Sequence, residues 1–197
     1  MADPVEILDF WLGEIGPEGW FAGAFAGGED IDAVISARFA EVLDALAAGH
    51  LEHWVDGAAG TLAYLIVADQ FSRNIHRGKG CAFATDARAL SAARVALEAG
   101  WDMDAPEPER QFFYMPFEHS EDLADQDLAV NLMVERMPGS PDMGLHARAH
   151  REVILRFGRF PFRNDALGRE STLEEAAFLE AGGYGAVVRG LSHAPGA

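Results

Sequence analysis

The segment that decides the fold reads AAGTLAYLIVADQFSRNI and covers residues 58–75. At 100° per residue, its apolar side chains lie on nearly every side of a helix. Such a helix is buried all round, so we expect residues 58–75 to form the central helix of the core. Asp69 and Arg73 fall in the middle of one apolar face, four residues apart, where they can pair. Because buried charges must be paired or hydrogen-bonded, we also expect partners from other segments.

Helical patterns dominate the remainder of the chain. Pro4 stands at a typical first-turn position, and Ser171–Glu175 forms a capping-box pattern at the start of the last predicted helix. A glycine-rich loop is expected at Gly23–Gly28. The other helices are predicted at Asp3–Gly13, Ile31–Gly49, Phe83–Gly100, Glu107–Tyr114, His119–Met137, Leu145–Phe157 and Ser171–Gly182.

These helices are joined by short loops rich in glycine and proline, which favours antiparallel helix pairs. No regular 34-residue repeat runs through the chain. We therefore expect an all-α fold of antiparallel helical hairpins, packed as a degenerate tetratricopeptide-repeat-like array. One domain is expected over residues 1–197, with an ordered core from roughly residue 3 to residue 190.

Composition excludes several classes of protein. The 197 residues are 49% hydrophobic, which is enough for a sizeable core. No run of about 18 uncharged apolar residues occurs and the first residues are acidic, so we expect neither a membrane span nor a secretory signal. A formal charge of −17 disfavours nucleic acid and anionic lipid as partners. Cys81 is the one cysteine, so no internal disulfide is possible and a cytoplasmic location is expected.

Three motifs carry the candidate functional residues. The first is DQFSRN, residues 69–74, and the second is FYMPFEHSED, residues 113–122. The third is RFGRFPFRN, residues 156–164, followed by LGR at 167–169. In the second motif, we expect Pro116 to end one helix. Residues 118–127 carry a net charge of −5, and residues 156–169 carry +3. We therefore expect two cationic loops, near Arg73 and at 159–169, to meet the acidic helix start at 118–122.

These motifs resemble the bacterial domain-of-unknown-function family 924. The resemblance extends from about Pro4 to Leu179 and includes Trp20-Phe21 and residues 49–54. It implies an all-helical fold similar to tetratricopeptide repeats, and it implies no activity. Where the family pattern leads us to expect a histidine between proline and arginine, this chain has Phe162. Any catalytic or ligand role of that histidine would be absent here.

A structural interpretation assigns the charged residues to the fold. Arginine's planar fork suits bidentate pairing with carboxylates, and irregular loops have backbone groups that arginine and asparagine can satisfy. The expected network joins Arg73, Arg159, Arg163 and Arg169 to Asp69, Glu118, Glu121 and Asp122.

A binding interpretation uses the same residues on a concave surface that takes a protein segment or a small anionic ligand. Apolar contact would come from Phe71, Tyr114, Phe160 and Trp54. The candidate binding residues are Asp69, Arg73, Asn74, Tyr114, Glu121, Gln126, Arg159, Arg163, Asn164 and Arg169. The oligomeric state is left open.

A catalytic interpretation makes His119 a general base oriented by Glu118 or Asp122, with arginines stabilising an anionic transition state, as in a hydrolase. A metal-dependent version uses His119, His146 and His150, the last two being four residues apart on one helical face. Inward histidines are more often hydrogen-bonded core residues, so no metal and no cofactor are expected. Phosphate loops, CxxC pairs, GxSxG elbows and dinucleotide fingerprints are absent from the sequence.

Overall fold

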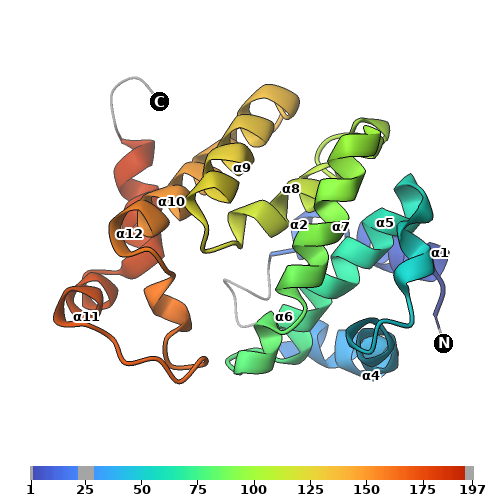
Figure 1. The fold of residues 1–197 in the computed structure, drawn as a ribbon, viewed down its shortest axis with the longest axis horizontal. Coiled ribbons are helices and arrows are strands. Elements are labelled where there is room, and N and C mark those ends of the chain that lie inside the picture. Colours follow the sequence, from blue (N-terminus) through green and yellow to red (C-terminus); the bar gives the residue numbers. More distant parts are fainter. Residues whose placement is uncertain (1, 22–28, 194–197) are drawn as a thin grey trace. The chain divides into compact units, whose positions relative to one another are not determined.

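The computed structural model describes residues 2–21 and 29–193, and within these ranges the chain is helical with no β-strand (Figure 1). The expected loop at Gly23–Gly28 lies outside the described residues. The chain divides into two compact units, Met1–Pro116 and Phe117–Ala197. The single domain expected over residues 1–197 stays a prediction. Of the described helices, none combines the length and apolar character that crossing a membrane requires.

The first unit contains most of the helices. The α-helices are α1 (Pro4–Leu8), α2 (Gly16–Gly19), α4 (Glu29–Ala47), α5 (Ala58–Leu65), α6 (Ser72–Ile75), α7 (Asp86–Ala99) and α8 (Gln111–Glu118). Between them lie π-helical segments at Asp9–Ile15 and Ile66–Phe71 and 3-10 helices at Glu52–Asp56, Gly80–Phe83 and Trp101–Asp104. The boundary between the two units falls within α8.

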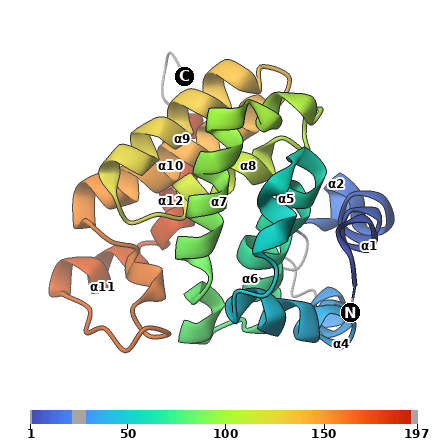
Figure 2. The same cartoon turned by 45° about the vertical axis from the view of Figure 1, so that its right-hand side comes forward.

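The central helix predicted from the sequence is confirmed. Residues 58–75 form one uninterrupted helical run, and every residue from Thr61 to Ser72 is buried. Helices α1 and α7 pack against α5, while α4 packs against the π-helical segment and α6 (Figure 2). The aromatic core next to this run holds the rings of Phe39 and Phe71, stacked with centroids 5.0 Å apart. This burial on all sides is what an all-round apolar sequence requires.

Pro116 does not end a helix, and the prediction that it does is wrong. Helix α8 continues to Glu118 through Pro116, which removes one backbone donor but lies in the last turns of the helix. The next helix, α9 (Leu123–Arg136), begins only after Asp122, whose carboxylate accepts from the backbone N–H of Ala124 at 2.8 Å. Asp122 is therefore an N-cap residue, which competes with any other role for its side chain.

The second unit is built around α10 (Pro141–Phe157), which packs against α9 and α12 (Gly183–Ser192) (Figure 2). A 3-10 turn at Pro161–Arg163 and helix α11 (Leu173–Glu180) complete it. Its core consists of Val153, Ile154, Phe160 and Phe178, flanked by Phe157, Tyr184 and Val187. Helices α9 and α10 form a hairpin, but tetratricopeptide-like stacking of hairpins stays a prediction.

Two helix termini in this unit test the sequence patterns. The predicted capping box is confirmed, because Thr172 and Glu175 each accept from the other's backbone N–H at the start of α11. The expectation that the last helix stops at the Gly182 region is correct for α11, but α12 was not predicted. Gly182 and Gly183, which mark a helix end in sequence, also begin α12, whose Tyr184 and Val187 pack on the core.

We predict that Gly60→Ala lowers the free energy of unfolding by about 1–3 kcal/mol. A Cβ at Gly60 would lie 2.3 Å from the backbone oxygen of Trp54, which cannot rotate away as a side chain does. Thermal or urea unfolding followed by circular dichroism measures the change. Gly13→Ala is the matched control, because Gly13 is helical and exposed, and no atom lies within 4 Å of a Cβ added there. Equal stability of the two variants would contradict the close approach.

Candidate functional site

The first charged cluster surrounds Arg73 at the end of the central helix. Its Nη1 lies 3.0 Å from Oδ1 of Asp69, and its two terminal nitrogens donate to both carboxylate oxygens of Asp86 at 2.9 and 3.0 Å. Burial would lower the pKa of Arg73, but the two aspartates outweigh it and raise that pKa. The predicted pairing of Asp69 with Arg73 is confirmed. Asp86, in the first turn of α7, was not predicted, because no local pattern connects it to residue 73.

Asn74 and Tyr114, two further candidates, are also held by aspartates of the first unit. The side-chain amide of Asn74 donates to Asp32 at 2.7 Å, and Arg77 donates to the same carboxylate at 2.5 and 2.8 Å. The hydroxyl of Tyr114 donates to Asp102 at 2.6 Å, and Tyr114 has no exposed surface. Tyr114 is therefore a core residue of the first unit, and its role as a ligand contact stays a prediction.

In the second unit, Glu121 and Arg169 hold the backbone of Phe160. Arg169 donates to both oxygens of Glu121 at 2.7 and 3.0 Å and to the carbonyl of Phe160 at 3.0 Å, while the N–H of Phe160 donates to Glu121 at 2.8 Å. Burial would raise the pKa of Glu121, but these hydrogen bonds outweigh it and lower that pKa. The expected clamp of a cationic loop on the acidic helix start is confirmed for Arg169.

Arg159 has a different partner from the one predicted. It donates to both oxygens of Glu175 at 2.6 and 2.7 Å, not to a carboxylate of residues 118–122 as we expected. Hydrogen bonds from Arg159 and from the backbone of Thr172 lower the pKa of Glu175 to about 2. Glu175 thus joins the loop 159–170 to the start of α11, and its capping box is the sequence signal that would have indicated a buried acceptor there.

The remaining candidates of the second unit serve backbone and aromatic groups. The side-chain amide of Gln126 donates to the carbonyls of Glu118 and Ser120 at 2.6 and 2.7 Å, which holds the turn after α8. Asn164 donates to Ser171 at 3.0 Å, and the guanidinium of Arg163 lies 4.4 Å from the ring centre of Phe160. Among these polar groups, the side-chain oxygens of Gln126 and Asn164 are buried without a hydrogen-bond partner.

Four titratable side chains meet around His150 on α10. Its Nδ1 lies 3.0 Å from the carbonyl of His146, 3.5 Å from Oε2 of Glu118 and 3.5 Å from the hydroxyl of Tyr184. The Tyr184 hydroxyl also lies 2.7 Å from Nδ1 of His146, and the ring of His119 lies edge-on to His150 at 5.8 Å. Tyr184 belongs to α12 and was missed for that reason.

The electrostatics of this cluster favour its neutral form. Burial, and then the positive charge that His119 and Arg163 can bring, hold the pKa of His150 well below its usual range. Burial also lowers the pKa of His146, while burial and the negative charge of Glu118 raise the pKa of Tyr184. Over residues 2–21 and 29–193, no three histidine, cysteine or carboxylate side chains are grouped so as to hold a metal ion, the alternative trio His119, His146 and His150 included.

Phe162 stands where a histidine was expected, and the residue is 44% exposed. It stacks on Phe160 with centroids 5.1 Å apart and lies 6.3 Å from the ring of Tyr184. Position 162 therefore borders the aromatic side of the cluster around His150. A phenylalanine at this position extends the apolar contact and supplies no proton donor or acceptor.

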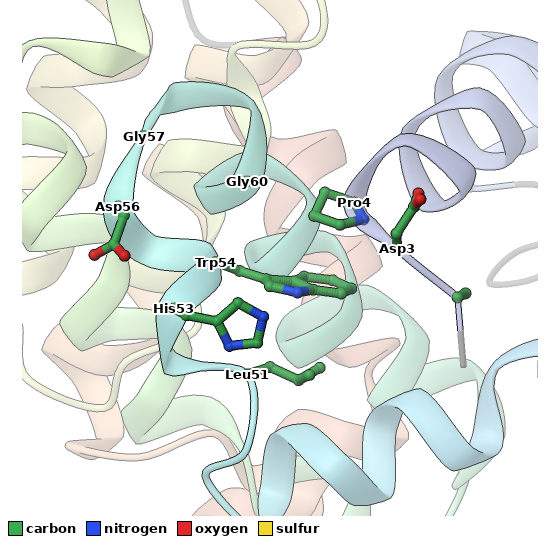
Figure 3. Close-up of a pocket in the computed structure, with 9 residues that line it drawn as sticks. Asp3, Pro4, Leu51, His53, Trp54, Asp56, Gly57 and Gly60 are labelled. Carbon is green, nitrogen blue, oxygen red and sulfur yellow. The ribbon is translucent and has the colours of Figure 1, made fainter.

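An apolar cavity of about 470 Å³ lies in the first unit, where the chain before α1 meets the segment leading into α5. We call it the Trp54 pocket. Figure 3 shows the indole of Trp54 extending between Pro4 and Leu51, with the ring of His53 beside it. Its lining residues are Ala2, Asp3, Pro4, Leu51, His53, Trp54, Asp56, Gly57 and Gly60.

Phe71, Tyr114, Phe160 and Trp54 were predicted to provide apolar contact to a ligand. Among these four, Trp54 lines the cavity described in the first unit. Phe71 and Phe160 are 0% exposed and serve the cores of their units. The remaining residues of the Trp54 pocket were missed. The signal available in sequence was a tryptophan followed within six residues by two glycines, Gly57 and Gly60, which is typical of a close backbone approach.

A family model described as "Bacterial protein of unknown function (DUF924)" matches residues 7–183, and the chain therefore belongs to this family. The chain is also similar to a solved structure, that of the protein of unknown function ATU0120 from Agrobacterium tumefaciens. The two sequences are 39% identical, the match covers 90% of this chain and 97% of the other, and the TM-score is 0.82. Comparison with curated proteins gives no match.

We predict that Arg169→Gln lowers the free energy of unfolding by about 1–3 kcal/mol, because it leaves Glu121 and the Phe160 carbonyl without a charged donor. Urea unfolding at neutral pH gives the value. Arg151→Gln is the matched control, since Arg151 and Asp127 form a pair whose side chains are 35% and 51% exposed. An exposed pair contributes at most about 1 kcal/mol. A loss at Arg169 no greater than at Arg151 would rule out a structural role for the former.

We predict a stability loss in mild acid that depends on His150. Because its pKa is lower in the folded than in the unfolded chain, stability is complete above about pH 6.5 and declines as the pH falls below it. The slope for one such group is at most about 1.4 kcal/mol per pH unit. Urea unfolding between pH 7.5 and pH 5.5 measures it, and His150→Gln should flatten the profile. His53→Gln, at an exposed position, is the control and should leave the slope unchanged.

Proposed function

We propose that this member of the family is a binding protein, whose Trp54 pocket takes an apolar side chain from a positively charged segment of a partner protein. The observation that carries the proposal is the pocket itself. A cavity of about 470 Å³ is within the size of sites that hold small ligands or single side chains. The apolar contact comes from Pro4, Leu51 and Trp54, and at Gly57 the space that a side chain would fill is open.

Charge supports a cationic partner. Asp3 and Asp56 line the pocket, and His53 is the one basic side chain of its lining. In the sequence of the first unit, 19 acidic residues stand against 7 lysines and arginines, a net charge of −12. Such a field attracts basic segments and repels acidic ones, and it acts on the association rate above all.

The arginine clusters give less support to a small anion as the ligand. Arg73, Arg159 and Arg169 each make bidentate contact with a carboxylate of the chain, so an incoming anion would have to displace an internal one. We propose that these arginines, together with the predicted candidates that contact them, form a structural network that fixes loops next to helices. The network then supports the fold without itself being the recognition surface.

A hydrolase-type or metal-dependent activity at His119 has less support still. Asp122, one of its proposed orienting groups, caps α9, and Glu118 lies 3.5 Å from His150. The lowered pKa values of His150 and His146 give no support to either of these two histidines as an alternative general base near neutral pH. A cytoplasmic setting fits the proposal, because the exposed thiol of Cys81 persists in a reducing compartment.

Binding is tested with two capped hexapeptides, acetyl-KKLLKK-amide and acetyl-EELLEE-amide, titrated into the protein by isothermal calorimetry. We expect the lysine peptide to bind with a dissociation constant in about the millimolar to micromolar range and the glutamate peptide to bind at least about tenfold more weakly. Gly57→Leu should abolish binding by filling the pocket, since no atom lies within 4 Å of the added Cβ.

Asp56→Asn should weaken binding of the lysine peptide, because it removes a carboxylate from the pocket lining. Asp44→Asn on α4 is the control, being exposed and outside the pocket. If both peptides bind equally, or if Gly57→Leu changes nothing, the Trp54 pocket is not the recognition site.

A further inference from the structure

A second concavity lies in the second unit, between the end of α10 and the pair α11–α12. It has a volume of about 320 Å³ and is built from small and aromatic side chains. We call it the α11–α12 groove. Its lining residues are Arg156, Ala177, Phe178, Ala181, Ala186 and Val187. The lining is therefore apolar apart from one guanidinium group, and it contains no carboxylate.

Arg156 is held over aromatic rings at the groove. Its guanidinium carbon lies 4.6 Å from the ring centre of Phe157 and 5.7 Å from that of Phe178, which fixes the cation by cation–π contact. Its internal partner is one oxygen of Glu174, at 3.2 Å, and the two side chains are 47% and 66% exposed. An ion pair with this exposure is weak, so another carboxylate can take the place of Glu174.

A second cation stands near the same helix pair. The guanidinium of Arg189 lies against the turn between α11 and α12, where a Cβ at Gly182 would be 3.1 Å from Nη2 and one at Gly185 would be 3.3 Å from Nη1. The same Cβ at Gly182 would be 3.5 Å from Ala186, a lining residue. Helix α12 itself contains no acidic residue, so Arg189 has no carboxylate partner on its own helix.

We infer that the α11–α12 groove binds a free medium-chain carboxylic acid, with the carboxylate on Arg156 and the hydrocarbon chain along Ala177, Ala181 and Ala186. Planar guanidinium groups pair with carboxylates through two parallel hydrogen bonds. The alanines leave the space that the chain fills, and Phe178 and Val187 provide its apolar walls. This site is independent of the Trp54 pocket, and its ligand has the opposite charge.

The volume guides the choice of chain length for the test ligand. A water molecule occupies about 30 Å³ in the liquid, so a cavity of this size accommodates about ten heavy atoms. Octanoate, with eight carbons and two oxygens, has that number. Shorter acids leave part of the groove unfilled, and acids much longer than this extend into solvent, where additional methylene groups contribute less to binding.

The experiment is a titration of the full ¹⁵N-labelled chain with sodium octanoate, followed by ¹H–¹⁵N correlation spectra. We expect saturable shifts of the amides of Ala177, Ala181, Gly182 and Ala186. Octylammonium, which has the same chain with a positive head, should cause no saturable shift at these amides. Butyrate should bind at least about tenfold more weakly than octanoate, because it buries four fewer methylene groups.

Two variants test the two halves of the site. Arg156→Gln should weaken octanoate binding at least about tenfold, whereas Arg148→Gln, an exposed arginine of the same helix outside the lining, should leave it unchanged. Ala181→Leu should block the groove, and the unperturbed spectrum elsewhere verifies that the variant is folded. The inference is overturned if octanoate causes no saturable shift, if the shifts lie elsewhere, if Arg156→Gln binds normally, or if octylammonium binds equally well. It is also overturned if a peptide ending in a free leucine carboxylate binds there and octanoate does not.

Discussion

The ion pair between Asp69 and Arg73 is the constraint on which the first unit depends. Asp69 is 2% exposed and lies on a helix that is buried from Thr61 to Ser72, so its charge requires a cation in place. Arg73 supplies that cation from the next turn and continues to Asp86, which connects the end of the central helix to the start of α7. A neutral or displaced side chain at residue 73 would leave a buried carboxylate unbalanced, which is far more costly than the loss of a surface pair.

Arginine–carboxylate pairs also stabilise the second unit. There they hold the backbone of a loop and a helix cap, whereas in the first unit they balance a charge on a buried helix. Glu121 and Arg169 serve the N–H and the carbonyl of Phe160, and Arg159 with Glu175 joins the loop to the cap of α11. Arginine suits these positions because its planar fork pairs with both oxygens of a carboxylate while it also donates to a carbonyl, as Arg169 does. Because these arginines are occupied in this way, we place the two proposed binding sites at the apolar cavities and not at the charged clusters.

Local patterns predicted the helices well. The all-round apolar run at 58–75, the capping box at Thr172 and the i, i+4 pair Asp69–Arg73 each follow from the chemistry of neighbouring residues, and each is confirmed. The prediction at Pro116 was wrong, because a proline in the last turns costs one hydrogen bond without stopping the helix. Helix α12 was missed because its paired glycines have the same local signature at a helix end and at a helix start.

Long-range partners could not be predicted in the same way. Any of 32 acidic residues is chemically suitable for Arg159, and only the path of the loop selects Glu175 over the carboxylates at 118–122. Asp86 and Asp32 were missed for the same reason. The Trp54 pocket and the α11–α12 groove arise from the packing of segments on one another, so their shapes are not written in any single stretch of sequence.

The central claim is that Arg73, which balances the buried Asp69, also connects the central helix to α7, and a double-mutant cycle on Arg73 and Asp86 tests it most directly. The free energy of unfolding is measured for the wild type, Arg73→Gln, Asp86→Asn and the double variant by urea titration at pH 7. Since Arg73 contacts both oxygens of Asp86, we expect a coupling energy of about 1–3 kcal/mol. If the two single effects add within about 0.5 kcal/mol, the arginine–carboxylate contacts do not hold these helices together.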